Sequence, residues 1–315
     1  MWLTFICFIA SCGVLVASGM RLVKSLSIIS EFLRITEFTA AFIIMAIATS
    51  LPELFVAVTS SLNNVPVLSL GNIIGANILN LTFVTGIIVL LGRGIKVRRK
   101  ETKKDSFFAV GILALPLLMF LIEGHISRIG GLILIVLFFA YSWFLMKERK
   151  KYQKPLENNI KKWQIVTESI LFVILIILLL FSANFVVRYA IQLSNEMNID
   201  PIMLGFFILS IGTVLPELVF GCSATLKGRG EMALGDQIGT IITNSTLVLG
   251  IAAVICPITA HVTSFLIGSV FMLLSAFIFA TFIASGKKFD ITEGISLILL
   301  YLFFVFLEFY TKGII

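Results

Sequence analysis

The chain has 315 residues, of which 59% are hydrophobic and 13% are charged, against about 25% charged residues in an ordinary soluble domain. Apolar runs long enough to cross a bilayer recur along its whole length, which excludes a soluble globular protein and predicts an all-α integral membrane protein. The sequence has no metalloprotease motif, Ser-His-Asp arrangement or phosphate-binding loop, so it predicts neither an enzyme nor an ATP-driven pump.

Ten membrane-spanning helices are predicted along the chain. Their expected ranges are 3–22, 37–62, 66–91, 106–123, 128–146, 165–192, 199–226, 232–256, 262–284 and 290–311. The first run lacks the basic start and the cleavage site of a signal peptide, so it is expected to remain as a helix. The connections are short except for two basic segments, 93–105 and 147–162.

The net charge of +7 is spread unevenly over these connections. If the N-terminus lies outside the cell, 21 of the 24 Lys and Arg residues fall in cytoplasmic segments, and only Arg128, Arg188 and Lys312 lie outside. This bias predicts an N-out, C-out protein of the cell membrane, with the lipid bilayer as its partner. Topology accounts for the basic residues, so no nucleic-acid partner is expected.

A basic segment in the middle divides the chain into two halves. We expect residues 1–146 to form a first five-helix repeat and residues 165–315 a second, with residues 147–164 as a basic cytoplasmic linker. Because five is an odd number, the second half enters the membrane in the opposite sense, which makes the halves inverted repeats. We expect the chain to function as a monomer.

An internal repeat carries the functional signal. Residues 46–86 align with residues 210–250 at a fixed offset of 164 positions, and 16 of the 41 aligned pairs are identical. The identities gather in two motifs, Thr-x-Leu-Pro-Glu-Leu (49–54 and 213–218) and Leu-Gly-x-x-Ile-Gly-x-x-Ile-x-Asn (70–80 and 234–244). The first motif places one acid, Glu53 or Glu217, in each copy.

The two glutamates are predicted to lie near the middle of the bilayer. Each is the sixteenth residue of its apolar run, 38–62 or 202–226. An ionised acid at that depth costs about 2.5–3.5 kcal/mol, and neither helix contains a Lys or Arg to pair with it. The acids are therefore expected either to be protonated or to bind a cation, and one divalent ion would neutralise both.

Oxygen atoms are the predicted ligands around the two acids. The candidate set is the side chains of Glu53, Glu217, Thr49, Thr213, Ser50, Asn80, Asn244 and Thr240, with the backbone carbonyls of Ala46 and Ser210. These side chains all belong to the two repeated motifs. Oxygen ligands without thiolate or imidazole indicate a hard-cation site for Ca²⁺, Na⁺ or Mn²⁺ rather than Zn²⁺ or Cu⁺.

A proline stands directly before each acid. Pro52 and Pro216 each remove a backbone N–H and crowd the carbonyl one turn earlier. We therefore expect the helices to open near residues 46–48 and 210–212 and to leave carbonyls free there.

The second motif contains further informative residues. The pairs Gly71/Gly75 and Gly235/Gly239 have the Gly-x-x-x-Gly spacing that predicts close helix packing. Asp236 stands where the first copy has an asparagine, and it is either part of a modified site or a local hydrogen-bonding group.

The repeated motifs resemble those of the cation/calcium exchanger superfamily, and most of all its prokaryotic sodium/calcium exchanger branch. The resemblance is carried by Ala-Thr-Ser-Leu-Pro-Glu (48–53), Gly-Asn-Ile-Ile-Gly-Ala-Asn-Ile-Leu-Asn (71–80) and their second copies. It implies an antiporter whose predicted helices 2, 3, 7 and 8 form the ion site, while helices 1 and 6 slide across it. It also implies Ca²⁺ ligands at Glu53, Glu217, Thr49 and Thr213, and Na⁺ ligands among the hydroxyls of both motifs.

The sequence departs from the family pattern at several positions. Val214 replaces the serine after the second threonine, Ala76 and Thr240 replace the serines of the Gly-Ser-Asn segments, and Asn244 stands where some relatives have Asp. The implied Ca²⁺ ligands are all kept, whereas two hydroxyls expected to bind Na⁺ are lost.

These observations predict a secondary antiporter that exchanges Na⁺ for Ca²⁺ by alternating access and needs no cofactor. Protons are expected to compete with Ca²⁺ for the two acids, so transport should fall as the pH drops. The alternative is exchange of Ca²⁺, or another divalent cation such as Mn²⁺, for H⁺ at the same acids, which the lost hydroxyls favour. A cation channel is a further alternative, but inverted repeats around one mid-membrane site favour alternating access.

Overall fold

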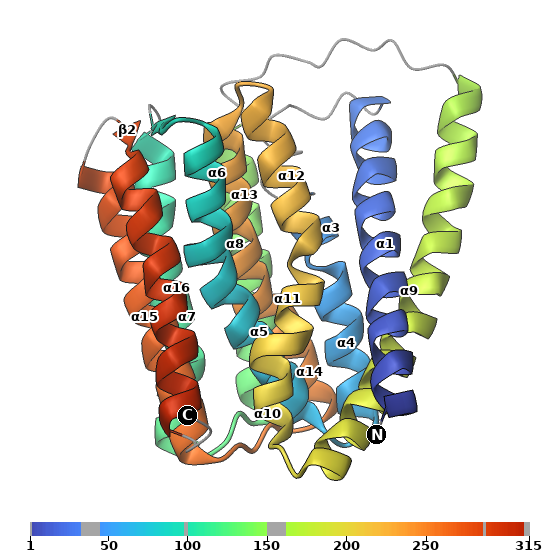
Figure 1. Cartoon of the computed structure of the whole chain (residues 1–315). Coiled ribbons are helices and arrows are strands. Elements are labelled where there is room, and N and C mark those ends of the chain that lie inside the picture. Colours follow the sequence, from blue (N-terminus) through green and yellow to red (C-terminus); the bar gives the residue numbers. More distant parts are fainter. Residues whose placement is uncertain (1, 33–44, 98–99, 150–161, 286–287, 312–315) are drawn as a thin grey trace.

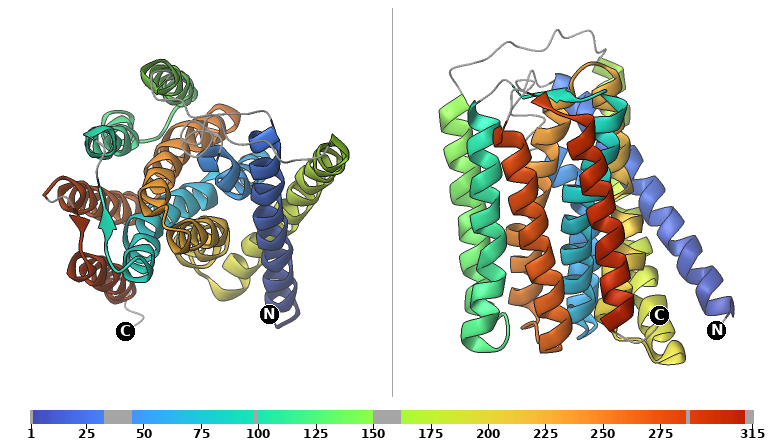
Figure 2. Two further views of the ribbon diagram at one scale, coloured as in Figure 1. Left: turned by 90° about the horizontal axis from the view of Figure 1, so that it is seen from above. Right: turned by 60° about the vertical axis from the view of Figure 1, so that its left-hand side comes forward.

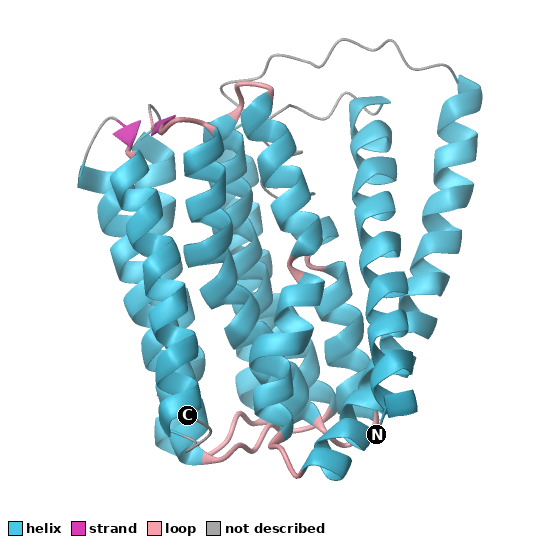
Figure 3. Ribbon diagram, in the orientation of Figure 1, coloured by secondary structure: helices cyan, strands magenta, loops and turns pink. Residues whose placement is uncertain are grey.

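The computed structural model describes residues 2–32, 45–97, 100–149, 162–285 and 288–311. The first half contributes α1 (Trp2–Phe32), α3 (Ala46–Thr49), α4 (Leu51–Leu62), α5 (Pro66–Leu79), η2 (Asn80–Val84), α6 (Thr85–Leu91), β1 (Ile95–Lys96), α7 (Lys100–Glu123) and α8 (Arg128–Arg149). The second half contributes α9 (Lys162–Met197), α10 (Pro201–Leu204), η3 (Gly205–Leu209), α11 (Ser210–Thr213), α12 (Leu215–Leu226), α13 (Gly230–Thr243), η4 (Asn244–Val248), α14 (Leu249–Ile255), α15 (Val262–Ser285), β2 (Lys288–Phe289) and α16 (Ile291–Thr311). These elements form a bundle of long helices (Figure 1), with loops mainly at its two ends (Figure 3).

Nine helices in the described part of the chain are long and apolar enough to cross a membrane. They coincide with nine of the predicted spans, among them Pro66–Leu91 and Val262–Ser285. The predicted span 37–62 begins outside the described residues, and its described apolar helix is Leu51–Leu62. Most of the predicted linker, 150–161, also lies outside the described residues.

The two repeats run in opposite directions through the bundle. The α4–α5 turn and the α12–α13 turn lie at opposite ends of the molecule (Figure 1). Each contains one residue in the left-handed conformation, Asn64 (φ 59°) or Gly228 (φ 76°), and these residues are 164 positions apart. The predicted inverted arrangement therefore extends to the turns.

Two short strand contacts follow the same relation. Ile95 of β1 pairs with Phe289 of β2, and Ile126 forms an isolated antiparallel bridge with Ile258. Adding the 164-residue offset to 95 and 126 gives 259 and 290, one residue from the observed positions 258 and 289. Each contact joins the two halves and is the counterpart of the other.

The described parts of the basic connections lie at one end of the molecule. In Figure 1, β2 and the α12–α13 turn lie at the upper end, whereas α1 begins and α16 ends at the lower end. This arrangement agrees with the predicted grouping of Lys and Arg on one side of the membrane. The N-out, C-out orientation itself stays a prediction.

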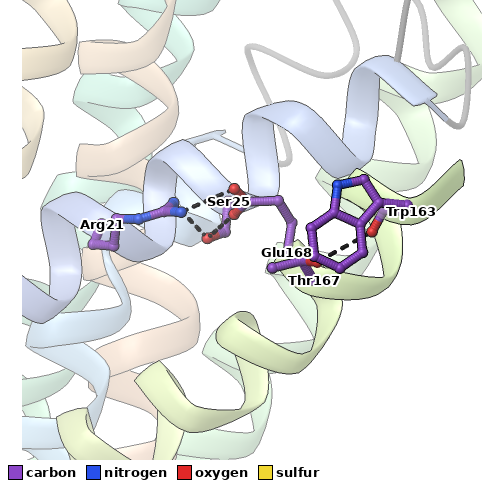
Figure 4. A network of polar contacts seen from close by, with 5 residues as sticks. All are labelled: Arg21, Ser25, Trp163, Thr167 and Glu168. Carbon is purple, nitrogen blue, oxygen red and sulfur yellow. Dashed lines mark hydrogen bonds and ion pairs between the residues drawn. The ribbon is translucent and has the colours of Figure 1, made fainter. Parts of the chain in front are cut away.

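Helices α1 and α9 form a pair at one side of the bundle (Figure 2). Their buried apolar residues belong to a cluster separate from the main core. Polar contacts join the pair near both ends. Arg21 donates hydrogen bonds to Ser25 and Glu168, both at 2.9 Å, and Ser25 donates to Glu168 at 2.8 Å (Figure 4), while Thr4 donates to Glu196 at 2.9 Å. These contacts hold α1 and α9 in one register.

Glycines bring α5 against the backbone of the second repeat. A Cβ atom at Gly71 would lie 2.2 Å from the carbonyl oxygen of Ile202, and one at Gly75 would lie 2.3 Å from that of Phe206. Side chains at these positions would therefore keep the two helices apart. The close packing predicted for this glycine pair is confirmed.

Candidate ion-binding site

The acids lie in the first turns of helices that begin in the middle of the bundle. Glu53 is the third residue of α4 and Glu217 the third residue of α12. Pro52 and Pro216 occupy the second positions, where a missing N–H costs no helical hydrogen bond. Figure 3 shows loop segments at mid-height where these helices are interrupted. The N-terminal N–H groups favour a negative charge there, and the C-terminal ends of α3 and α11 favour a cation.

The helix interruptions lie a few residues later than predicted. They fall at Ser50 and Val214, directly before the Leu-Pro-Glu sequences. The carbonyl of Ala46 accepts a hydrogen bond from the Ser50 N–H (3.2 Å), and that of Ser210 accepts one from the Val214 N–H (3.0 Å). The predicted opening at these two carbonyls is therefore wrong. A proline removes the donor to the carbonyl four residues before it, so earlier carbonyls keep their bonds.

Glu53 and Glu217 are both completely buried. They come from different repeats, and their carboxylates are close enough to interact electrostatically. Within the described residues, none of their four oxygens accepts a hydrogen bond of normal geometry. Burying a carboxylate without a partner is costly, so this pair is the strongest candidate for binding a cation.

Each acid faces the threonine of the opposite repeat. The Thr213 hydroxyl lies beside the Glu53 carboxylate, and the Thr49 hydroxyl lies beside that of Glu217. Neither hydroxyl forms a hydrogen bond of normal geometry with the acid. The fold thus brings together the four residues that the family resemblance implies as Ca²⁺ ligands.

Helices α5 and α13 position the two threonines. Thr213 Oγ1 donates to Asn72 Oδ1 at 3.2 Å, and Thr49 Oγ1 lies 3.3 Å from Thr240 Oγ1. Both contacts join one repeat to the other. Ser50, the predicted ligand next to Thr49, is buried, and its hydroxyl has no partner among the described side chains and backbone.

The two predicted asparagines begin π-helical turns at equivalent places. Asn80 starts η2 and Asn244 starts η4, and both side chains are fully buried. Asn244 Nδ2 donates to Asn77 Oδ1 at 3.2 Å, and Asn77 Nδ2 donates to Ser245 Oγ at 2.8 Å. In the described structure, both polar atoms of Asn80 and the Oδ1 atom of Asn244 have no partner. Such π turns often mark functional sites, and these two leave amide oxygens available.

Sequence reasoning missed three polar residues of this region. Asn77 and Ser245 have apolar counterparts in the other copy, so a search for duplicated residues passes over them. Asn72 was not proposed, although its counterpart Asp236 is also polar, and this shared polarity was a usable signal.

The chemistry of the site suits a hard cation. No group of three or more His, Cys, Asp and Glu side chains that could hold a metal is found in the ranges described. The site instead offers two carboxylates together with hydroxyl and amide oxygens. This set matches hard cations such as Ca²⁺ and Na⁺.

Comparison with known proteins identifies the family. The profile of the sodium/calcium exchanger protein family matches residues 3–147 and 168–310. The chain belongs to the sodium/calcium exchanger family. It is 30% identical to CaxA of Alkalimonas amylolytica over 257 residues, which cover 77% of this chain and 78% of that protein. It is 25% identical to the sodium/calcium exchanger MaX1 of Methanosarcina acetivorans over 336 residues, with 91% and 93% of the two chains covered.

A solved structure shares the fold of this exchanger. The sodium-calcium exchanger NCX_Mj, soaked with Na⁺ and Sr²⁺, matches with a TM-score of 0.69 and 24% identity, covering 96% of this chain and 97% of that chain. The predicted all-α membrane fold is thereby confirmed. This exchanger is an integral membrane antiporter and not an enzyme, as the sequence predicted.

Proposed function

We propose that this antiporter exchanges Ca²⁺ for Na⁺ and binds Ca²⁺ between Glu53 and Glu217. The observation that carries the proposal is the pair of buried carboxylates whose four oxygens have no hydrogen-bond partner in the described structure. A divalent cation between them would neutralise both charges. It would also provide the partner that mid-membrane carboxylates require.

Nearby oxygens can complete the coordination of Ca²⁺. This ion accepts about six to eight oxygen ligands, and a carboxylate can supply two of them. The hydroxyls of Thr49 and Thr213 lie beside the acids, and the Asn80 amide offers a further unpaired oxygen nearby in the repeated motif. Because both repeats of one chain supply these ligands, we expect the exchanger to function as a monomer.

Helix α1 is placed to control access to this site. A Cβ atom at Gly19 would lie 2.9 Å from Pro52 Cγ and 3.3 Å from Pro216 Cγ, so α1 packs against both helix interruptions. Its polar contacts attach it to α9. A displacement of α1 and α9 as one body would therefore expose the acids first to one side of the membrane and then to the other.

The names of relatives favour Na⁺ as the counter-ion, since MaX1 and NCX_Mj are both called sodium/calcium exchangers. One observation favours exchange of Ca²⁺ for H⁺ instead. Val214 and Ala76 stand where the family pattern has hydroxyls, which leaves fewer neutral oxygens for Na⁺. Proton-coupled exchange is therefore the second candidate.

The proposal is tested by Ca²⁺ uptake into proteoliposomes of the purified protein, driven by an outward Na⁺ gradient or an outward H⁺ gradient. Glu53→Gln and Glu217→Gln are each expected to weaken Ca²⁺ binding by at least about 30-fold, because each variant keeps only one of the two buried carboxylates of the pair. Glu123→Gln is the matched control. Glu123 lies exposed at the end of α7, so this variant should transport Ca²⁺ normally.

Each outcome of this experiment has a distinct meaning. Uptake driven by Na⁺ supports the proposal, and uptake driven only by H⁺ supports the second candidate. Conductance without exchange would indicate a channel. Normal transport by both Gln variants would reject the two acids as the Ca²⁺ site.

A further inference from the structure

The inverted symmetry divides the ion site into two half-sites. We name them by their place in Figure 1, where the α12–α13 turn lies at the upper end. The upper half-site consists of Thr49, Ser50, Glu217, Asp236 and Thr240, and the lower half-site consists of their counterparts Thr213, Val214, Glu53, Asn72 and Ala76. The contacts between Thr49 and Thr240 and between Thr213 and Asn72 show that each half-site combines residues of both repeats.

The half-sites differ in their chemistry. The upper one has three hydroxyls and two carboxylates, whereas the lower one has a single hydroxyl, one carboxylate and one amide. Both departures that remove hydroxyls, Val214 and Ala76, fall in the lower half-site. The extra acid, Asp236, falls in the upper one. Differences that look scattered in the sequence therefore lie on one side of the site.

The two counterparts Asn72 and Asp236 have different surroundings. Asn72 accepts the hydrogen bond from Thr213, so its oxygen is engaged. Asp236 is fully buried, and neither of its carboxylate oxygens has a partner in the part of the chain described. A local hydrogen-bonding role would give these oxygens a donor. The described residues give them none.

Asp236 also lies near Glu217, the central glutamate of its own repeat. Its charge interacts with that of Glu217. Helix α12 ends and α13 begins at the turn at the upper end. Asp236 lies six residues from this end of α13, and Glu217 lies nine residues from this end of α12. Asp236 is therefore about one helical turn nearer the upper end. Thr240 lies one turn further along α13, beside Thr49. Of the two acids of the second repeat, Asp236 is therefore the one nearer the upper end.

We propose that Asp236 is a further cation-binding residue and makes the upper half-site the site of the Na⁺ counter-ion. The inference rests on the proposed function and adds one anionic ligand to the proposed cation site. Carboxylate and hydroxyl oxygens bind Na⁺ as a hard cation, and a negative ligand raises affinity.

The test measures how much Na⁺ is needed to displace Ca²⁺ from the purified full-length protein at equilibrium. Asp236→Asn is expected to raise the half-displacing Na⁺ concentration about tenfold, and to lower the Ca²⁺ affinity measured without Na⁺ by a smaller factor. Ser50→Ala, a small change that removes a hydroxyl of the same half-site, should shift the Na⁺ value in the same direction. The double variant Asn72→Asp/Asp236→Asn moves the carboxylate to the lower half-site and should not restore the Na⁺ value.

Several results would overturn the inference. They are an unchanged Na⁺ value in Asp236→Asn, an equal loss of Ca²⁺ and Na⁺ affinity, and full recovery in the double variant. Should Asp236→Asn not fold, an unchanged Na⁺ value in Ser50→Ala would reject the upper half-site as the Na⁺ site. Displacement is measured without transport, so a failure of the proposed function is seen separately, as Ca²⁺ binding that no Na⁺ gradient converts into uptake.

Discussion

The contact between α5 and η3 at Gly75 can be tested by adding a single methyl group. In Gly75→Ala the new Cβ would lie 2.3 Å from the carbonyl oxygen of Phe206 and 2.8 Å from its carbonyl carbon and Cα. All three are backbone atoms, so no side chain can rotate away. Reaching an ordinary contact of 3.4 Å requires the two helices to separate by about 1 Å.

This separation has two expected consequences. Overpacking of this kind costs about 1–3 kcal/mol of stability, so the unfolding temperature in detergent should fall. The hydrogen bond from Thr213 to Asn72 crosses the same interface at 3.2 Å, and a further 1 Å would break it. Because Thr213 lies beside Glu53, Ca²⁺ uptake should fall by about tenfold or more, as it does when a reacting group is misplaced by about 1 Å.

Gly111→Ala is the matched control. Gly111 lies within the apolar helix α7, and an added Cβ there would meet no atom within 4 Å. The unfolding temperature and uptake of this variant should equal those of the unaltered protein. If Gly75→Ala behaved in the same way, the backbone contact between α5 and η3 would not position the site, and the reasoning would be refuted.

Three further predictions concern helix α1 and the two acids. Arg21→Gln should change the unfolding free energy by less than about 1 kcal/mol, because the Arg21–Glu168 pair is partly exposed, but it should slow Na⁺-driven exchange by loosening α1 from α9. The exchanged pair Arg21→Glu/Glu168→Arg should restore the rate, and a rate that is unchanged in Arg21→Gln would contradict this. Gly19→Leu should stop exchange while equilibrium Ca²⁺ binding persists, because its side chain would collide with both prolines; normal exchange would contradict it. The Ca²⁺ concentration for half-maximal uptake should rise as the pH falls, because protonation removes the charges of Glu53 and Glu217. The expected rise is up to about tenfold per pH unit for each proton that Ca²⁺ displaces. A value independent of pH would exclude competition between H⁺ and Ca²⁺.

Much of the candidate site could be predicted because its residues occur twice. Glu53 and Glu217 share one register, and a duplicated acid within an apolar run has few structural explanations. The same signal found both threonines and both asparagines at the repeat positions. It missed Asn77 and Ser245, since neither is duplicated and their contact depends on how α5 meets η4. It also placed the helix openings too early, because the carbonyls of Ala46 and Ser210 lie further back than the position where each proline removes a donor, and they keep their helical hydrogen bonds.

The sequence by itself determined the membrane class, the near-complete set of spans, the inverted repeat and the two central acids. Each of these follows from a local or periodic property of the chain, such as hydropathy, the placement of charge or a fixed offset. Only the tertiary structure decided which threonine faces which acid, and it paired each acid with the threonine of the other repeat. It alone showed that Asp236 lies near Glu217 without a hydrogen-bond partner in the described chain. The physical reason is that these relations arise where separate helices meet, those of different repeats for the threonines and those of one repeat for Asp236 and Glu217. No single helix specifies how closely it approaches another, and at Gly71 and Gly75 the separation is set by backbones in contact.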